Sequence, residues 1–542
     1  MTHPTGDTKA MIYRKFPLRY RRVRLAGLGA MLLLGAACNS DKLTNVNEDP
    51  NNPTSAPPQA VFTYATRIAA QRWFGSNPTN LRGPVLTAQH LAQVQYPDED
   101  TYARLDGTVT NNSFVFTYIS ELKNFQAVVN AGKAADQPLL WGPPLIMRSL
   151  IFGYLTDVWG DVPYSEALQG DDEVIIIQPV YDAQQAIYDG LFADLGEAVT
   201  AIAGAPSSAV TLGGADPIYG GNSLRWQRFG NSLRARHAMR LANIDAAKAQ
   251  AQLTAAIGAP GGLMASNADN AQMDWPGGGV YDNPWSVNNQ TRDDHRLSNR
   301  LMGQMLPHND PRVPVYAQPT LASGTDPLAP EYAGMPNGLT ATEAGTYSLT
   351  TSRPGAVFYS NNAFCSSCSS LPGANFPSFI LTYAEVSFIL AEARERGWIT
   401  TGTAATYYEQ GIRASMEQWG VTDAAAITAF LAQPGIVYVP GTEGLRRIAL
   451  QKWIALYTDG VEAWAEWRRT CVPATVVPGS AAVINTVPRR YQYSTRERSV
   501  NGANVDAAIA RQGPDEFTTR IYWDSNPTAA PTYPGPSCGV RP

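Results

Sequence analysis

The sequence has few charged residues, few histidines and few cysteines for its length. Of its 542 residues only 16 % are Asp, Glu, Lys or Arg, five are His, and the net charge is −5. Nucleic-acid binding proteins carry clustered positive charge, so this balance argues against a nucleic-acid partner. The histidines include no pair at metal-binding spacing, and we expect neither a metal site nor a cofactor.

The common enzyme signatures are also missing. The chain contains no GxSxG, no HExxH, no P-loop and no GxGxxG opening a helix. Its 46 acids would supply paired carboxylates in many combinations, so their number alone does not indicate a glycoside hydrolase. Asp157 and Asp161 lie four residues apart, and we interpret them as turn and cap residues at the end of a buried helix. We therefore expect a protein that is not an enzyme, with a hydrolase of unrecognised site as the least favoured alternative.

No hydrophobic run is long enough to cross a bilayer. The most apolar stretch, "LAGLGAMLLLGAA", has about 13 residues, whereas a spanning helix needs about 20. A basic segment precedes it, and the order of basic, apolar and small residues predicts a cleaved export signal over residues 1–37. Met11 is an alternative start. The basic residues are Arg14, Lys15, Arg19, Arg21, Arg22 and Arg24.

Cys38 follows the apolar run directly, as the lipid-bearing cysteine of a lipoprotein does. Leu34 stands four residues before it rather than the usual three. Acyl chains on Cys38 would anchor the protein to a membrane; the alternative is an ordinary signal peptide with an incidental cysteine. Residues 38–58 have no hydrophobic periodicity and are predicted to form a flexible tether.

The other four cysteines are even in number, which in an exported protein favours disulfides. We expect one bridge between Cys365 and Cys368 and a second between Cys471 and Cys538. The "CSSC" motif is also compatible with half of a zinc site or a redox pair, although no second CxxC exists.

Residues 59–542 are predicted to form a mainly α-helical body. Apolar residues make up 44 % of the chain and aromatic residues 10 %, which excludes general disorder. In the first helix, Val61, Tyr64, Ala65, Ile68 and Ala69 share one face. Two later helices joined by a short turn are similar to a tetratricopeptide unit. Helical periodicity covers residues 58–74, 145–160, 181–202, 223–243, 379–397, 404–420 and 443–470. In the Arg-rich helix 225–240 we expect the arginines to pair with carboxylates inside the protein.

Two regions lack this periodicity: a loop insertion over about 259–375 and a C-terminal region over about 471–542. Irregular loops on a rigid body commonly carry function. Aromatic rings stack on sugar faces while Asn, Asp and Arg bind hydroxyl groups, although packing in the core is an equal alternative for each ring. The candidate ligand-binding residues, in or beside these loops, are Trp73, Tyr96, Tyr102, Trp275, Tyr281, Trp285 and Tyr332.

The segment "DVWGDVPYSEA" (157–167), after a buried helix, resembles the most characteristic segment of the SusD/RagB family. That family comprises surface lipoproteins of nutrient-uptake systems, best known from Bacteroidota. The resemblance is colinear over nearly all of the mature chain. It continues through 179–198, 220–241, 309–316, 332–339, 381–398, 407–420, 450–470 and 487–501.

The resemblance implies a SusD-like fold, with tetratricopeptide-like helical hairpins as scaffold and long irregular loops as the ligand-binding face. It also implies a non-catalytic, lipid-anchored protein at the outer membrane, exposed on the cell surface. Such a protein captures glycan oligomers and delivers them to a SusC-like TonB-dependent barrel. A member that binds peptides or another nutrient is the alternative. The ligand-contacting aromatics of the family follow no motif, so none is transferred to this chain.

Overall fold

The computed structural model describes residues 56–75, 78–170, 175–323, 331–360, 363–365, 368, 371–526, 530–532 and 538–541. Contacts divide the chain after Pro57, and the unit Pro58–Pro542 is described here. The predicted export signal and Cys38 lie outside the described residues. None of the described helices is long and apolar enough to cross a membrane.

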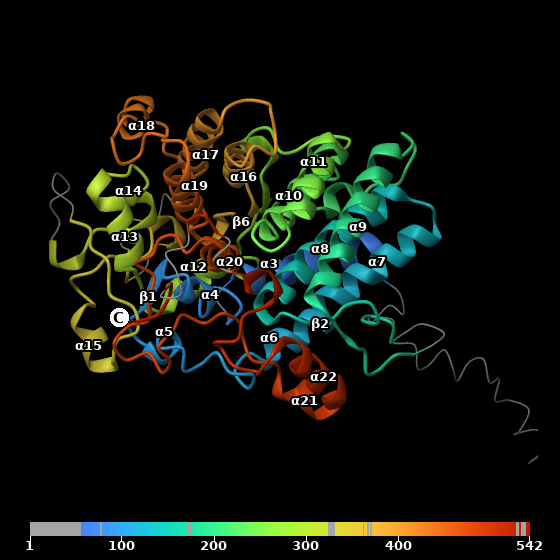
Figure 1. Ribbon diagram of the computed structural model, residues 1–542, viewed down its shortest axis with the longest axis horizontal. Coiled ribbons are helices and arrows are strands. Elements are labelled where there is room, and N and C mark those ends of the chain that lie inside the picture. Colours follow the sequence, from blue (N-terminus) through green and yellow to red (C-terminus); the bar gives the residue numbers. More distant parts are fainter. Residues whose placement is uncertain are drawn as a thin grey trace, which may run out of the picture. The chain divides into compact units, whose positions relative to one another are not determined.

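The unit is mainly helical, as predicted (Figure 1). The longer helices of the first half are α3 (Pro58–Trp73), α7 (Lys123–Ala134), α8 (Pro138–Trp159), α9 (Gln184–Gly204), α10 (Ser223–Arg240) and α11 (Ala246–Gly258). Those of the second half are α16 (Tyr383–Glu395), α17 (Ala404–Gln418), α18 (Ala424–Leu431), α19 (Thr442–Ala455), α20 (Gly460–Thr470) and α22 (Gly502–Gln512).

Shorter helices connect these. They are α4 (Pro84–Thr87), α5 (Pro97–Asp100), α6 (Asn111–Phe116), α12 (Pro284–Thr291), α13 (Asn299–Met305), α14 (Val313–Tyr316), α15 (Ala341–Thr346) and α21 (Thr495–Val500). A π-helix, η1 (Thr117–Leu122), joins α6 to α7. Single 3₁₀ turns are η2 (Gly213–Ala215), η3 (Asn267–Asp269), η4 (Leu306–His308), η5 (Leu321–Ser323), η6 (Ala356–Phe358), η7 (Gly373–Asn375) and η8 (Tyr522–Asp524).

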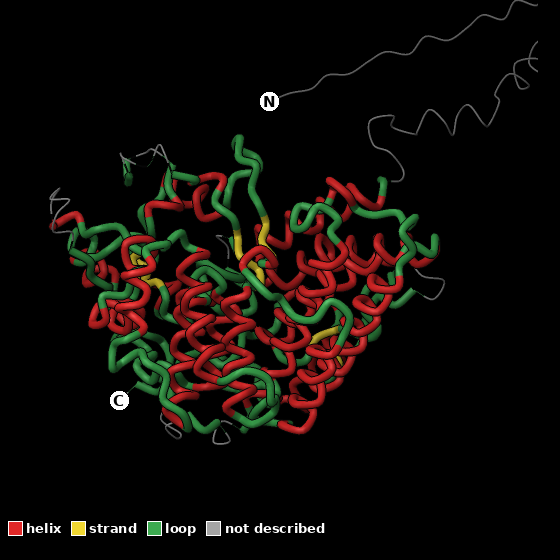
Figure 2. Tube along the Cα trace, turned by 90° about the horizontal axis from the view of Figure 1, so that it is seen from above, coloured by secondary structure: helices red, strands yellow, loops and turns green. Residues whose placement is uncertain are grey.

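Strands are few and short (Figure 2). β1 (Leu91–Gln93) pairs with β5 (His295–Leu297), β2 (Val162–Pro163) with β3 (Tyr181–Asp182), and β4 (Ala271–Met273) with β6 (Ser378–Leu381), all antiparallel. Each pair joins segments far apart in the sequence or on either side of a loop. The strands therefore fasten loops to the helical scaffold rather than form a sheet of their own.

Successive helices lie side by side in the manner of tetratricopeptide hairpins. α7 contacts α8, α8 contacts α9, α9 contacts α10, and α10 contacts α11; α16 and α17 form a further pair that meets α10 through α16 (Figure 1). α8 is apolar on every side and almost wholly buried, as expected for the central helix of a bundle. It ends at Gly160, whose φ of +84° favours glycine.

α3 buries only part of the face predicted from the sequence. Its buried residues include Phe62, Ala65, Ala69 and Trp73, whereas Tyr64 is exposed. The pattern contained two overlapping apolar stripes. Phe62 and Trp73 are the larger side chains with contacts in the interior, and they determine which stripe faces the core.

The single helix predicted over 443–470 is two helices. α19 ends at Ala455 and α20 begins at Gly460. Between them Thr458 has a φ of +86°, and the side chain of Asp459 accepts a hydrogen bond from the Glu462 N–H, capping α20. The apolar periodicity continues across the break because both helices pack on the same core, and so it did not reveal the turn.

A network of buried ion pairs connects the helices of the scaffold. Arg236 on α10 binds Glu385 on α16 (Nη2–Oε2, 2.5 Å), and Arg240 binds Asp157 on α8 (Nε–Oδ2, 3.1 Å) and Glu462 on α20. Arg236 and Arg240 therefore pair with carboxylates inside the protein, as expected, whereas Arg234 binds Gln252 instead. Further members are Lys452, Asp459, Glu466, Arg469, Glu392 and Arg396.

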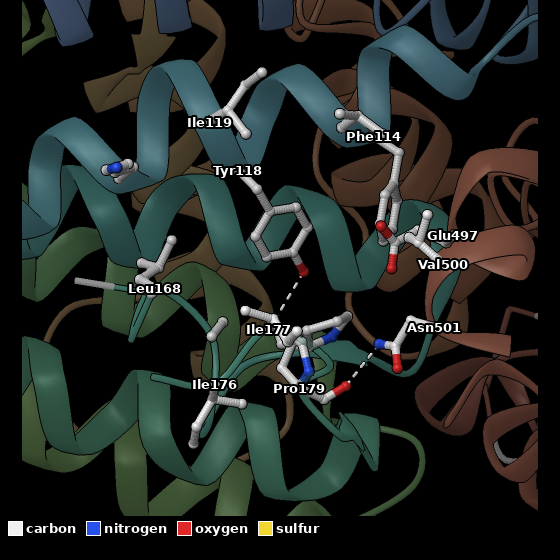
Figure 3. A pocket seen from close by; sticks show the side chains of 15 residues that line it. Phe114, Tyr118, Ile119, Leu168, Ile176, Ile177, Pro179, Glu497, Val500 and Asn501 are labelled. Atoms are coloured by element: carbon white, nitrogen blue, oxygen red, sulfur yellow. Dashed lines mark hydrogen bonds between the residues drawn. The ribbon is translucent and has the colours of Figure 1, made fainter. Parts of the chain in front are cut away.

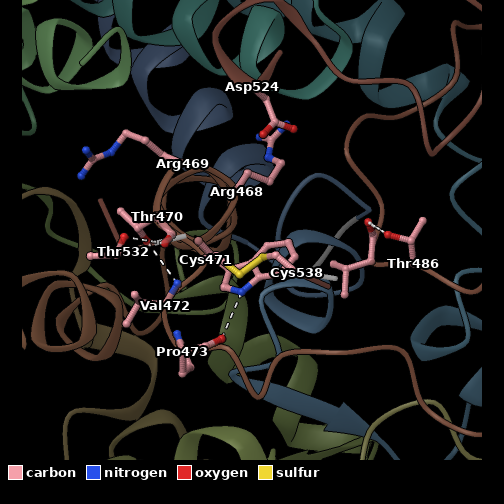
Figure 4. The surroundings of a disulfide bond; sticks show 12 residues. Arg468, Arg469, Thr470, Cys471, Val472, Pro473, Thr486, Asp524, Thr532 and Cys538 are labelled. Carbon is pink, nitrogen blue, oxygen red and sulfur yellow. Dashed lines mark hydrogen bonds between the residues drawn. A yellow bond between two sulfur atoms is a disulfide. The ribbon is translucent and has the colours of Figure 1, made fainter. Parts of the chain in front are cut away.

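Two disulfides lie in the irregular regions, Cys365–Cys368 and Cys471–Cys538, the pairs named from the sequence. Cys471 follows the last residue of α20, and its bond to Cys538 closes a loop of 67 residues in sequence (Figure 4). Thr532 Oγ1 also donates to the Thr470 carbonyl, 2.7 Å away. The disulfide and this hydrogen bond both hold the C-terminal segment to the end of α20.

Candidate functional site

Four of the seven aromatic candidates are packed inside the protein. Trp73, Tyr102, Trp275 and Trp285 are each at most 2 % exposed. Trp73 stacks on Tyr154 with ring centroids 5.4 Å apart. A ring covered by protein cannot stack on a ligand, and this corrects the expectation for these four residues.

Hydrogen bonds of the buried indoles show what they do instead. Trp285 Nε1 donates to the Phe74 carbonyl at 3.0 Å, and Trp275 Nε1 donates to Ser378 Oγ at 3.0 Å. Both tryptophans come from the loop insertion. They fasten its start to the scaffold, much as the strand pair β4–β6 does.

The remaining candidates, Tyr96, Tyr281 and Tyr332, are accessible to different degrees. Tyr332 is half-buried against the core, and burial raises the pKa of its hydroxyl. Tyr96 is 38 % exposed and Tyr281 is 48 % exposed. The structure thus leaves two of the seven rings well placed for stacking.

Tyr281 belongs to an exposed cluster with Tyr64 and Arg67, which we call the Arg67 cluster. The Arg67 Cζ lies 5.8 Å from the ring centroid of Tyr64 and 5.6 Å from that of Tyr281. Tyr64 is 46 % exposed, and the Arg67 guanidinium also donates to Gln71 Oε1 at 3.0 Å. Two accessible rings with a cation between them combine stacking surfaces with hydrogen-bond donors.

Glycines build the loop that brings Tyr281 to this cluster. Gly277, Gly278 and Gly279 have φ values of +78°, +82° and +96°, a region that other residues rarely adopt. The Gly277 N–H donates to the Tyr281 carbonyl at 3.1 Å, and the Gly279 N–H donates to Asp282 Oδ1 at 2.8 Å. The turn is closed by its own hydrogen bonds and presents Tyr281 at its end.

Tyr96 belongs to a second exposed cluster, with Arg82 and Arg292. Each guanidinium carbon lies 5.7 Å from the Tyr96 centroid, and Arg292 Nη1 donates to the Tyr96 hydroxyl at 3.3 Å. Arg82 binds Glu99, and Arg292 lies 3.5 Å from Asp294. This second cluster, which we call the Tyr96 cluster, offers one ring with alternating charges around it.

The acidic segment at 98–106 is used internally. Asp98 pairs with Arg104, and Asp100 accepts hydrogen bonds from the Gln93 and Gly338 N–H groups and from Asn337 Nδ2. Burial raises the pKa of Asp100 to about 6 against the opposing effect of these hydrogen bonds. The carboxylate joins the Tyr96 loop to the loop after Met335, which stabilises the surface that carries Tyr96.

Asp157 and Asp161 hold helices together. Asp157 is buried within α8 and accepts hydrogen bonds from Tyr188, Trp523 and Arg240, so it is not the cap that the sequence predicted. Asp161 Oδ1 accepts from the Gln184 N–H at 2.8 Å, the first residue of α9. It therefore joins the end of α8 to the first turn of α9, which begins after Ala183.

An apolar cavity of about 280 Å³ lies beside η1 (Figure 3). Tyr118 forms part of its wall and donates its hydroxyl to the Pro163 carbonyl at 2.8 Å; Asn501 donates to the Pro179 carbonyl at 2.8 Å. These two polar side chains thus form hydrogen bonds within the protein, and the cavity offers a ligand mainly apolar contact. The apolar walls include Phe114, Ile119, Leu168, Ile176, Ile177 and Val500.

Comparison with known families decides the assignment. A family profile described as "SusD-like: Starch-binding associating with outer membrane" matches residues 50–494. The chain belongs to the SusD-like family. Members of this family bind carbohydrate without catalysing a reaction, and the SusD-like chain described here is accordingly not an enzyme.

Solved structures agree with this SusD-like assignment. A chitin-binding protein is 26 % identical, with a TM-score of 0.72, over 87 % of this chain and 100 % of its own. A SusD homologue from Bacteroides uniformis is 25 % identical, with a TM-score of 0.71, over 86 % and 99 %. One from Bacteroides fragilis is 25 % identical, with a TM-score of 0.72, over 87 % and 99 %. No curated relative matches the chain.

Sequence reasoning missed Tyr64, Arg67, Arg82 and Arg292. Tyr64 was assigned to the apolar face of its helix, although a tyrosine three residues before an arginine on one helix face is the spacing at which the two side chains meet. That spacing was a usable indication. The partners of Tyr96 come from segments about 200 residues apart in sequence (Arg292 and Tyr96 are separated by 196), and no local pattern connects them.

Proposed function

We infer that this SusD-like chain binds glycan oligomers on the surface that carries the Arg67 cluster, and supplies them to a transport protein. The observation that carries the proposal is the pair of half-exposed rings, Tyr64 and Tyr281, on either side of one guanidinium. Rings of this kind stack on sugar faces, and a guanidinium donates to hydroxyl groups. The Tyr96 cluster is the second proposed contact.

The ligand class rests on two supports. The family description names starch binding, and one similar structure is called a chitin-binding protein. Both polymers present flat sugar rings and neutral hydroxyl groups, which suit exposed tyrosines better than they suit a strongly charged surface. We therefore place neutral oligosaccharides first.

Titration calorimetry of residues 38–542 against soluble oligosaccharides of starch, chitin and other neutral glycans tests this. We expect saturable binding to at least one of them, with affinity increasing with chain length as more rings are engaged. Binding to none of the oligosaccharides, together with binding to peptides, would replace the glycan by the peptide alternative.

The location and partner are part of the same proposal. We propose that Cys38 carries the lipid, that the protein lies on the outer face of the outer membrane, and that its partner is a SusC-like TonB-dependent barrel. The family description, which includes association with the outer membrane, supports this. Mass spectrometry of the mature N-terminus should find an acylated Cys38, and Cys38→Ala should release the protein from membranes. A tagged chain should co-purify with a large barrel protein; an unmodified N-terminus or a soluble native protein would contradict the anchor.

A further inference from the structure

A polar cavity of about 420 Å³ opens at the surface of the helical scaffold, apart from both tyrosine clusters. α7, α8 and α9 contribute Gln126, Arg148 and Asp194, and the segment after β2 contributes Tyr164 and Gln169. None of its lining residues belongs to the Arg67 cluster or the Tyr96 cluster. Its volume falls at the lower end of the range of small-ligand sites, roughly 300–1,000 Å³.

The charged groups of this cavity are fixed in place and neutralise each other. Arg148 Nη2 binds Asp194 Oδ2 at 2.6 Å, and Arg148 Nη1 donates to Gln126 Oε1. The Tyr164 hydroxyl also donates to Asp194 Oδ2, at 2.8 Å. Burial and the Asp194 charge raise the pKa of Tyr164, so this hydroxyl keeps its proton. Helices hold Gln126, Arg148 and Asp194, and their mutual hydrogen bonds give the preorganised geometry that a binding site requires.

Several polar atoms at the cavity have no partner among the described residues. The hydrogen bonds of three lining residues leave the Asn130 amide nitrogen, one Asp194 carboxylate oxygen and the Gln169 amide oxygen unused. Donors and acceptors therefore both remain available. A hydroxyl group both donates and accepts, so a ligand with several hydroxyl groups matches this set.

The wall of the cavity has an unusual backbone. Leu168 has a φ of +66°, which is uncommon for a non-glycine residue and persists only where the surrounding structure holds the chain. Leu168 lines this polar cavity and also the apolar one in Figure 3. It lies in the segment "DVPYSEALQG", whose beginning identified the family but which the tyrosine clusters do not use.

We propose that this cavity is a second binding site, for a neutral polyhydroxylated small molecule of the size of a mono- or disaccharide. An anion is disfavoured because Asp194 lines the site and Arg148 is already paired. A cation is disfavoured because Arg148 lies beside Asp194. The proposal stands independently of the glycan surface, since it rests on residues that surface does not include.

The test measures the binding of glucose, N-acetylglucosamine and their disaccharides to residues 38–542 by saturation-transfer NMR and by calorimetry. Asn130→Ala combined with Asp194→Asn should weaken binding about tenfold, the usual effect of losing hydrogen bonds to a charged group. Asn124→Ala, on the same helix but outside the cavity, should leave binding unchanged. Asp194 also pairs with Arg148, so replacing Asp194 could lower the stability of the protein. The single variant Asn130→Ala avoids this because Asn130 is exposed. It should keep the wild-type melting temperature and still weaken binding.

Two sets of variants distinguish this site from the proposed glycan surface. Tyr64→Ala with Tyr281→Ala should retain binding of the small sugars, whereas the cavity variants should retain binding of long oligosaccharides. The proposal is overturned if none of the small sugars binds, if Asn130→Ala binds them as the wild type does, or if the tyrosine variant abolishes their binding. Failure of long oligosaccharides to bind would overturn only the proposed function.

Discussion

Arg236 and Arg240 each lie between carboxylates in the helical core, whereas Arg67 lies between two tyrosine rings at the surface. Both core arginines are at most 2 % exposed, and Glu385, Asp157 and Glu462 neutralise them. Arg67 has no carboxylate partner among the described residues, and its two rings are about half exposed. The buried arginines are neutralised by carboxylates and hold helices together, whereas the surface groups keep ring faces and donors for a ligand.

Removing one core carboxylate should have the largest effect. Glu462→Gln leaves Arg240 and Lys452, both buried, short of a negative charge. Although burial alone would raise the pKa of Glu462, Arg240, Arg236 and Lys452 hold that pKa well below its usual range. We expect a loss of about 4 kcal/mol in the free energy of unfolding, measured by urea denaturation.

Glu443→Gln is the matched control. Glu443 also binds two arginines, Arg446 and Arg447, but its side chain is 37 % exposed. The expected loss is below about 1 kcal/mol. Equal losses in the two variants would mean that burial does not distinguish the core network from surface ion pairs.

Trp285→Ala should separate packing from binding. The indole is buried against Phe358 and bonded to the Phe74 carbonyl, so its removal should cost about 3 kcal/mol of stability. Oligosaccharide affinity of the folded variant, measured by calorimetry well below its melting temperature, should be unchanged. A weakened affinity with an unchanged melting temperature would mean that Trp285 contacts the ligand.

The core should also show a pH dependence that can be assigned to one residue. Burial, opposed by Arg236, raises the pKa of Asp459 to about 7. For an acid with a raised pKa the folded state binds more protons than the unfolded state, so stability falls as pH rises from about 4 to 7.

Asp459→Asn removes this dependence. Between pH 5.5 and 7.5 the wild type should lose about 2 kcal/mol relative to the variant. Denaturation curves of both proteins at the two pH values measure the difference. No difference between the two pH values would contradict this, because it would show that Arg236 already holds Asp459 ionised in the folded state.

The sequence predicted most of the scaffold because its helices carry regular apolar patterns, as in α9, α10 and α17. It did not predict the break at Thr458, since a left-handed residue leaves no mark on apolar spacing. Nor did the sequence show that Trp73 is buried and Tyr281 exposed. Both residues are aromatic and near loops, and only the fold determines which ring is covered. The Arg67 cluster depends on a contact between α3 and a loop more than 200 residues later in the chain, between Arg67 and Tyr281.

Removing the two rings of the Arg67 cluster should change a free energy least among these variants, but it tests the account most directly. The measurement is the affinity of the wild type and of Tyr64→Ala with Tyr281→Ala for the best oligosaccharide, beside their melting temperatures. We predict that affinity falls about tenfold, since each stacking ring contributes about 0.5–1.5 kcal/mol, while the melting temperature stays within the error of the wild type. An unchanged affinity in this folded variant would contradict the account.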